Sequence, residues 1–278
     1  MRKLISVIIS FSIFFNLFVF VADAANQKTY YIVLGDSIAY GSGLKNPEEA
    51  CYGKIVADSN GYEYSNHSVP GHSSNDLLNI IAEEDVIEDI KKADIISISI
   101  GGNDFLTDNA SDLIFDSVLE NDYSRFDEIA EEYYINITKI ISTIKNYNSN
   151  AVILMQNLYN PQSEDLKEIC KQGTDRINKA ISLYESEHPD EIIIIDTASA
   201  LNGNSNNFAK DGIHPSAEGN EKIAKLIIDK LYSINLSDSA EMIIQTKGKD
   251  ISVNILLNLS IKTLTFVVKF IAFLYRFI

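Results

Sequence analysis

The 278-residue chain has a formal net charge of −16, from 23 basic and 39 acidic side chains, and 46% of its residues are apolar. Such a chain can form one large domain or two small ones around a sizeable core. The acidic balance argues against a nucleic-acid-binding surface, which requires clustered Lys and Arg. It reflects solubility more than it indicates a substrate.

The first 24 residues have the pattern of a secretory signal peptide. Arg2 and Lys3 form a positively charged start, residues 4–21 are apolar, and residues 22–24 (Ala-Asp-Ala) supply the small side chains that a signal peptidase recognises. We therefore predict cleavage after Ala24 and a secreted protein that can remain at the cell surface or membrane. The alternative is an uncleaved membrane anchor.

Export would allow a disulfide between the two cysteines, Cys51 and Cys170. The alternative is two separate buried thiols, and the sequence leaves both open. The chain has no CxxC, HExxH or Cys/His cluster, so no metal site is indicated.

Short apolar runs predict β-strands, and longer amphipathic patterns between them predict helices. The expected strands are residues 30–34, 62–66, 94–100, 152–157 and 192–196. The expected helices are residues 47–59, 74–92, 124–147, 163–187 and 215–234. Apolar strands that alternate with helices indicate an α/β fold, with a parallel sheet between two layers of helices. We assign one such domain to residues 27–235.

The C-terminal segment differs from this domain. After a linker at 236–250, residues 251–278 carry only three charged side chains, Lys262, Lys269 and Arg276, which lie seven positions apart on one face of a helix. The longest uncharged run has 11 residues, whereas a bilayer-spanning helix needs about 20. We predict an amphipathic helix in the membrane interface, with its cations at anionic headgroups. The alternative is a helix packed on the domain or on another subunit.

Gly35-Asp36-Ser37 follows the first predicted strand. A serine there would project from the carboxyl edge of the sheet, and its backbone N–H would lie at the start of a helix or turn, which favours an anion. The motif alone is weak, because a serine at such a turn more often caps a helix.

The segment 211–215 (Asp-Gly-Ile-His-Pro) places a carboxylate three residues before a histidine, with Pro215 opening the final helix. The Asp211 carboxylate can accept the Nδ1–H of His214, which leaves Nε2 free to take a proton from a serine. Taken alone, this spacing more often means a capping aspartate and a surface histidine.

Two further turns follow predicted strands. In Gly101-Gly102-Asn103-Asp104 the glycines allow the backbone to approach a ligand, and the Asn103 amide can donate a hydrogen bond to an oxyanion. In Val69-Pro70-Gly71 the bare N–H of Gly71 could reach the same oxyanion. Each segment alone would be an ordinary turn.

Together and in this order, the segments resemble the conserved blocks of the SGNH hydrolases, also called GDSL esterases and lipases. The resemblance covers roughly residues 30–232. Residues 35–41 resemble the first block, 66–71 the second, 102–104 the third, and Asp211 with His214 the fifth. The family resemblance implies a five-stranded parallel sheet of flavodoxin-like order.

The resemblance also implies roles for individual residues. Ser37 would be the nucleophile, His214 the general base and then the general acid, and Asp211 the residue that orients the histidine. The oxyanion hole would consist of the Ser37 N–H, the Gly71 N–H and the Asn103 side chain. No cofactor is required.

Other polar residues near this edge are expected to have supporting roles. We interpret Asp36 and Asp104 as structural hydrogen-bonding residues. His67 and His72 lack an acidic partner at the spacing seen for His214, and His188 is expected at the surface.

The predicted function is therefore an exported serine esterase or lipase that hydrolyses a small-molecule or lipid-like ester through an acyl-enzyme. The polar segment 105–123 is expected to shape the acyl or leaving-group pocket at the carboxyl edge. One alternative is a carbohydrate O-deacetylase with the same triad. Another is a non-catalytic envelope-binding module that keeps the fold.

Overall fold

A computed structural model describes residues 28–105, 113, 116–120, 122–160 and 167–244. The predicted signal peptide, the predicted helix at 251–278, the end of the predicted linker and most of segment 105–123 lie outside the described residues. What is described of segment 105–123 includes a π-helix, η2 (Asp116–Glu120), ahead of the long helix α8 (Ser124–Tyr147).

The described strands form one five-stranded parallel sheet in the order β2-β1-β3-β4-β5. These strands are β1 (Tyr30–Gly35), β2 (Glu63–Asn66), β3 (Ile95–Ser99), β4 (Val152–Gln156) and β5 (Ile193–Ile195). The order confirms the predicted flavodoxin-like sheet. Every residue of β3 is buried, its isoleucines and its serines alike, as expected for a parallel strand covered by helices on both faces.

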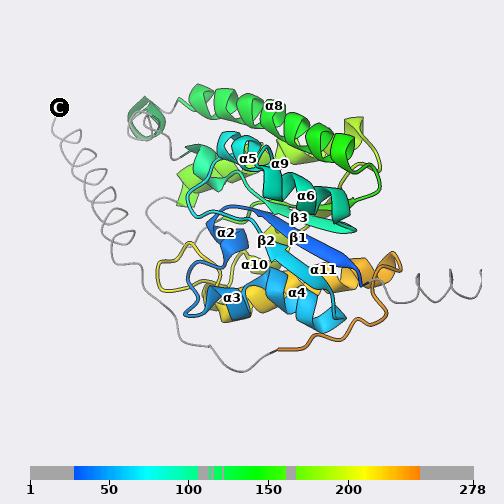
Figure 1. Cartoon of the computed structure of the whole chain (residues 1–278). Helices are drawn as coiled ribbons and strands as arrows, with labels where there is room; N and C mark the ends of the chain where they lie inside the picture. Colours follow the sequence, from blue (N-terminus) through cyan, green and yellow to red (C-terminus); the bar gives the residue numbers. More distant parts are fainter. Residues whose placement is uncertain (1–27, 106–112, 114–115, 121, 161–166, 245–278) are drawn as a thin grey trace, which may run out of the picture.

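Helices cover both faces of the sheet, as Figure 1 shows. On one face lie α5 (Ser74–Ile80), α6 (Glu84–Lys92), α8 and α9 (Lys167–Glu187). On the other lie α4 (Tyr52–Asn60), α10 (Thr197–Leu201) and α11 (Ala217–Ser233). Each layer buries its own apolar cluster against the sheet, so the three-layer α/β/α prediction is confirmed.

Two of the predicted helices are each divided. The pattern at 47–59 forms α3 (Pro47–Ala50) and α4, because Cys51 between them has extended backbone angles and acts as the N-cap of α4. The pattern at 74–92 forms α5 and α6, because Glu83 is extended and acts as the N-cap of α6. An apolar periodicity continues across such breaks, so it cannot reveal them.

Cys51 and Cys170 are free thiols. Cys51 is buried at the start of α4, whereas Cys170 lies on α9 over the opposite face, so the sheet separates them. Within the described ranges, no group of three or more His, Cys, Asp or Glu side chains could hold a metal ion. Nor does this part of the chain contain a helix with the length and apolar character needed to cross a membrane.

Candidate active site

The turn after β1 positions Ser37. Gly35 has φ of 144°, and a Cβ there would lie 2.0 Å from the carbonyl oxygen of Ser99, so only glycine fits. Asp36 then caps the short helix α2 (Ser37–Tyr40), because its side chain accepts the N–H of Ile38 at 2.9 Å. The capping role thus belongs to Asp36, and the Ser37 hydroxyl is left for another partner.

That partner is His214. Its Nε2 lies 3.0 Å from Ser37 Oγ, and its Nδ1 lies 2.8 Å from Asp211 Oδ2. The other carboxylate oxygen, Oδ1, accepts the backbone N–H groups of Ile213 at 2.9 Å and His214 at 3.0 Å. His214 is therefore within hydrogen-bond distance of both Ser37 and Asp211, as the sequence predicts, although 177 positions separate it from Ser37.

The electrostatic environment keeps Asp211 ionised. Burial alone would raise the pKa of Asp211, but the hydrogen bonds from His214 and the N–H of Ile213 outweigh it and hold that pKa below its ordinary value. Asp36 behaves differently, since burial raises its pKa to about 7 against the effect of the Ile38 N–H. Asp211 is thus the fixed negative charge beside His214.

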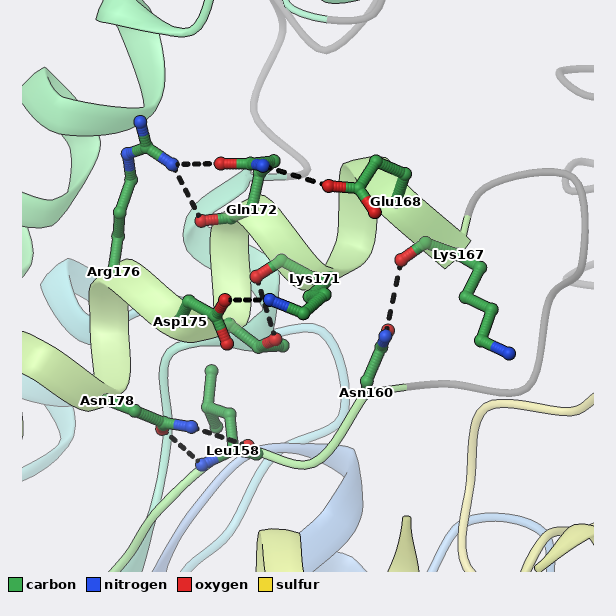
Figure 2. Close-up of polar contacts among 10 residues, drawn as sticks. Leu158, Asn160, Lys167, Glu168, Lys171, Gln172, Asp175, Arg176 and Asn178 are labelled. Atoms are coloured by element: carbon green, nitrogen blue, oxygen red, sulfur yellow. Dashed lines mark hydrogen bonds and ion pairs between the residues drawn. The ribbon is translucent and has the colours of Figure 1, made fainter. Parts of the chain in front are cut away.

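The loop after β4 supports the histidine. Tyr159 donates its hydroxyl hydrogen to the carbonyl of Ile213 at 2.7 Å, directly before His214. Asn178 of α9 in turn holds this loop, since it accepts the N–H of Leu158 at 2.7 Å and donates to the Leu158 carbonyl at 2.8 Å (Figure 2). Sequence reasoning missed Tyr159, because no local spacing connects it to residue 213.

The Gly71 and Asn103 segments adjoin each other at the same edge. Asn103 lies in the 3₁₀ turn η1 (Gly102–Phe105), and its Nδ2 donates to the carbonyl of His72 at 2.9 Å. A side-chain amide has two donor hydrogens, so one remains for a ligand. Gly71 has φ of 88°, and a Cβ there would meet nothing within 4 Å, so its backbone borders open space. The N–H of Val69 ties this turn to the Gly35 carbonyl at 3.0 Å.

The other histidines occupy separate places. His67 has no acidic residue at the spacing seen for His214, as expected, but its Nε2 lies 2.8 Å from Oδ2 of the distant Asp89 on α6. His188 stacks on Tyr184 with ring centroids 4.5 Å apart. The Nδ1 of His72 has no hydrogen-bond partner among the described residues.

Asp104 has a structural partner that the sequence did not indicate. It accepts the N–H of Ser74 at 3.0 Å and the Ser74 hydroxyl, and Asn136 of α8 donates to that hydroxyl oxygen at 2.9 Å. Burial raises the pKa of Asp104 to about 6, although both bonds from Ser74 lower it. The predicted hydrogen-bonding role of Asp104 is therefore observed, with Ser74 of α5 as the direct partner and Asn136 of α8 bonded to Ser74.

The sequence matches the family profile described as GDSL-like Lipase/Acylhydrolase over residues 31–227. It is 28% identical over 219 residues to the uncharacterized protein YpmR of Bacillus subtilis. The matched residues cover 74% of this chain and 83% of that protein. It is 27% identical over 206 residues to the spore germination lipase LipC of Bacillus licheniformis, covering 70% of this chain and 92% of that protein.

Among solved structures, the lipase Lip_vut3 from a goat rumen metagenome superposes with a TM-score of 0.59 at 23% identity, covering 77% of this chain and all of that one. This similarity supports the fold. Because the family profile covers well over half of the sequence, the chain belongs to the GDSL-like lipase/acylhydrolase family and is a carboxylic ester hydrolase.

Proposed function

We propose that the chain is an exported serine esterase or lipase in which Ser37 is the nucleophile, His214 the general base and Asp211 the residue that orients the histidine. The observation that carries the proposal is the position of His214 between the other two residues. Its Nε2 lies 3.0 Å from Ser37 Oγ, and its Nδ1 lies 2.8 Å from Asp211 Oδ2. These distances are those expected of a nucleophile, its base and the group that orients the base.

In the proposed reaction, Ser37 Oγ attacks the ester carbonyl while His214 Nε2 takes its proton. The oxyanion accepts hydrogen bonds from the Ser37 and Gly71 N–H groups and the free hydrogen of the Asn103 amide, each contributing about 3–4 kcal/mol. His214 then protonates the leaving alcohol, and the acyl group stays on Ser37. Water, deprotonated by His214, attacks the acyl-enzyme and releases the carboxylic acid and the free serine.

A fluorophosphonate probe and a series of p-nitrophenyl esters from acetyl to palmitoyl test this function. We expect the probe to modify Ser37 stoichiometrically and the esters to be hydrolysed, with activity extending to longer acyl chains for a lipid-like substrate. Hydrolysis confined to acetyl esters and acetylated sugars would favour the O-deacetylase instead. A folded protein that neither labels nor hydrolyses any ester would identify a binding module.

Asn103→Ala should lower kcat by about 10²-fold and change KM little, because a bond to the oxyanion forms mainly in the transition state. The measurement is steady-state kinetics on a soluble ester, with the melting temperature recorded for each variant. Asn160→Ala serves as the control, since this amide lies in the neighbouring loop and bonds to the Lys167 carbonyl. An unchanged kcat for Asn103→Ala would remove Asn103 from the oxyanion hole.

We also propose that residues 251–278 attach the exported enzyme to an anionic membrane surface. The support is the sequence pattern, in which Lys262, Lys269 and Arg276 would share one face of a predicted, mostly apolar helix. Deleting 251–278 should abolish sedimentation with vesicles containing phosphatidylglycerol and preserve hydrolysis of a soluble ester. Full-length protein that ignores such vesicles would contradict the proposal.

A further inference from the structure

A chain of buried hydrogen bonds connects α8 to the segment that follows β3. It runs from Asn136 Nδ2 to Ser74 Oγ at 2.9 Å, and from the Ser74 hydroxyl to Asp104 Oδ1. The N–H of Ser74 donates to the other carboxylate oxygen of Asp104 at 3.0 Å. The exposed fractions of Asn136, Ser74 and Asp104 are 9, 0 and 8%, so water competes little for these bonds.

The chain has a defined direction. An amide nitrogen such as Asn136 Nδ2 can only donate, so Ser74 Oγ must accept from it. The single hydrogen of the Ser74 hydroxyl is then free to point at Asp104, and the backbone N–H of Ser74 points at the same carboxylate. Asn136 therefore fixes the rotation of the hydroxyl, and both donors of Ser74 are directed at Asp104.

This carboxylate lies between the two segments that carry the proposed oxyanion donors. Ser74 is the first residue of α5 and comes three positions after Gly71, while Asp104 directly follows Asn103. A second tie joins the same segments, since Asn103 Nδ2 donates to the His72 carbonyl at 2.9 Å. The segments that carry Gly71 and Asn103 are thus joined by the bonds between Ser74 and Asp104 and by the bond from Asn103 to His72.

We propose that Asn136 and Ser74 are positioning residues, which act through Asp104 to hold the Gly71 and Asn103 donors at the spacing that an oxyanion requires. The inference rests on the proposed function, because it assumes that these two donors form the oxyanion hole. Asn136 itself touches no reacting atom. A donor displaced by a fraction of an ångström loses much of its effect in the transition state, whereas substrate binding depends on it less.

The free-energy cost of burying the Asp104 carboxylate is consistent with a functional role in positioning the two donors. Burial raises the pKa of Asp104 to about 6, so keeping this carboxylate ionised costs free energy that its hydrogen bonds from Ser74 only partly offset. Departures from the most stable choice of residue are expected at functional sites. Assays at pH 8 keep this carboxylate ionised and isolate the effect of its partners.

The test is Asn136→Ala in the full mature chain, assayed on a soluble ester at pH 8. We expect kcat to fall about 10-fold and KM to stay within about 2-fold, the pattern of a lost transition-state interaction. Ser74→Ala should give a similar loss, and the double variant should fall no further than Ser74→Ala alone, because the two side chains act in series.

Asn148→Ala is the matched control. Asn148 caps the other end of α8 and donates to the carbonyls of Ile90 at 2.9 Å and Ala93 at 2.7 Å, so its loss should lower the melting temperature and leave kcat per folded enzyme unchanged. If Asn136→Ala behaves in the same way, or if the losses of the single variants multiply in the double variant, the inference is wrong.

Two further outcomes are distinguishable. If Asn136→Ala does not fold, Ser74→Ala tests the inference instead, because that variant keeps the backbone N–H bond to Asp104. A fall in kcat with little change in KM would support the positioning role. A higher KM with an unchanged kcat would overturn the inference. If the unaltered protein neither hydrolyses esters nor labels with a fluorophosphonate, the proposed function itself fails, and the positioning role fails with it.

Discussion

Replacing Ser37 by alanine should lower the rate of ester hydrolysis by about 10⁴-fold or more, because the acyl-enzyme can no longer form. The fold should persist. The hydroxyl of Ser37 bonds to His214 Nε2, whereas the cap of α2 is the Asp36 side chain, which the substitution does not alter. We therefore expect a melting temperature within about 2 °C of the unaltered protein, as for substitutions that leave buried contacts intact.

The measurement is kcat/KM on a soluble ester, together with fluorophosphonate labelling followed by peptide mass analysis. Ser42→Ala is the control, since Ser42 lies five positions further along and its backbone N–H bonds to the Ser37 carbonyl. That variant should remain active and label at Ser37. A Ser37→Ala protein that retains most of its activity would end the assignment of Ser37 as nucleophile.

The sheet was predictable because its strands are buried. Strands such as β1 appear in the sequence as apolar runs, since both of their faces are covered by helices. Helices as short as α2 and α10 were not predicted, because four or five residues do not establish a periodicity. The breaks at Cys51 and Glu83 were missed because neither residue is a usual N-cap type and neither side chain makes a cap hydrogen bond.

The site divides in a similar way. Ser37, Asp211 and His214 could be predicted, because each lies in a short motif and the motifs together, in this order, resemble the blocks of a known family. Within the last motif, the Asp211 carboxylate accepts hydrogen bonds from the backbone and ring of His214. Tyr159 and Asn136 could not be predicted, because each acts across 54 or 62 positions on a partner in another element. The residues that carry the proposed chemistry are thus local in sequence, while those that hold them are distant.

Asp211→Asn should lower kcat by about 10⁴-fold at neutral pH, the size of effect seen when the base of a serine hydrolase is held in the wrong tautomer. Here the backbone dictates the tautomer. The N–H groups of Ile213 and His214 both donate to Oδ1, so an asparagine at this position must place its carbonyl oxygen there.

The NH₂ group of the introduced asparagine would then face His214 Nδ1 in place of Oδ2. In the native site Oδ2 accepts a hydrogen bond from that nitrogen over 2.8 Å. Because NH₂ can only donate, Nδ1 must become the acceptor and the ring proton moves to Nε2, which can no longer take the proton of Ser37. Asp196→Asn is the control, since this carboxylate caps α10 and bonds to Asn157 without a histidine partner. The measurements are the steady-state rate and the melting temperature, so that a loss of kcat through the wrong tautomer is distinguished from a loss through unfolding. Near-native kcat in Asp211→Asn would show that Asp211 does not set the proton position on His214.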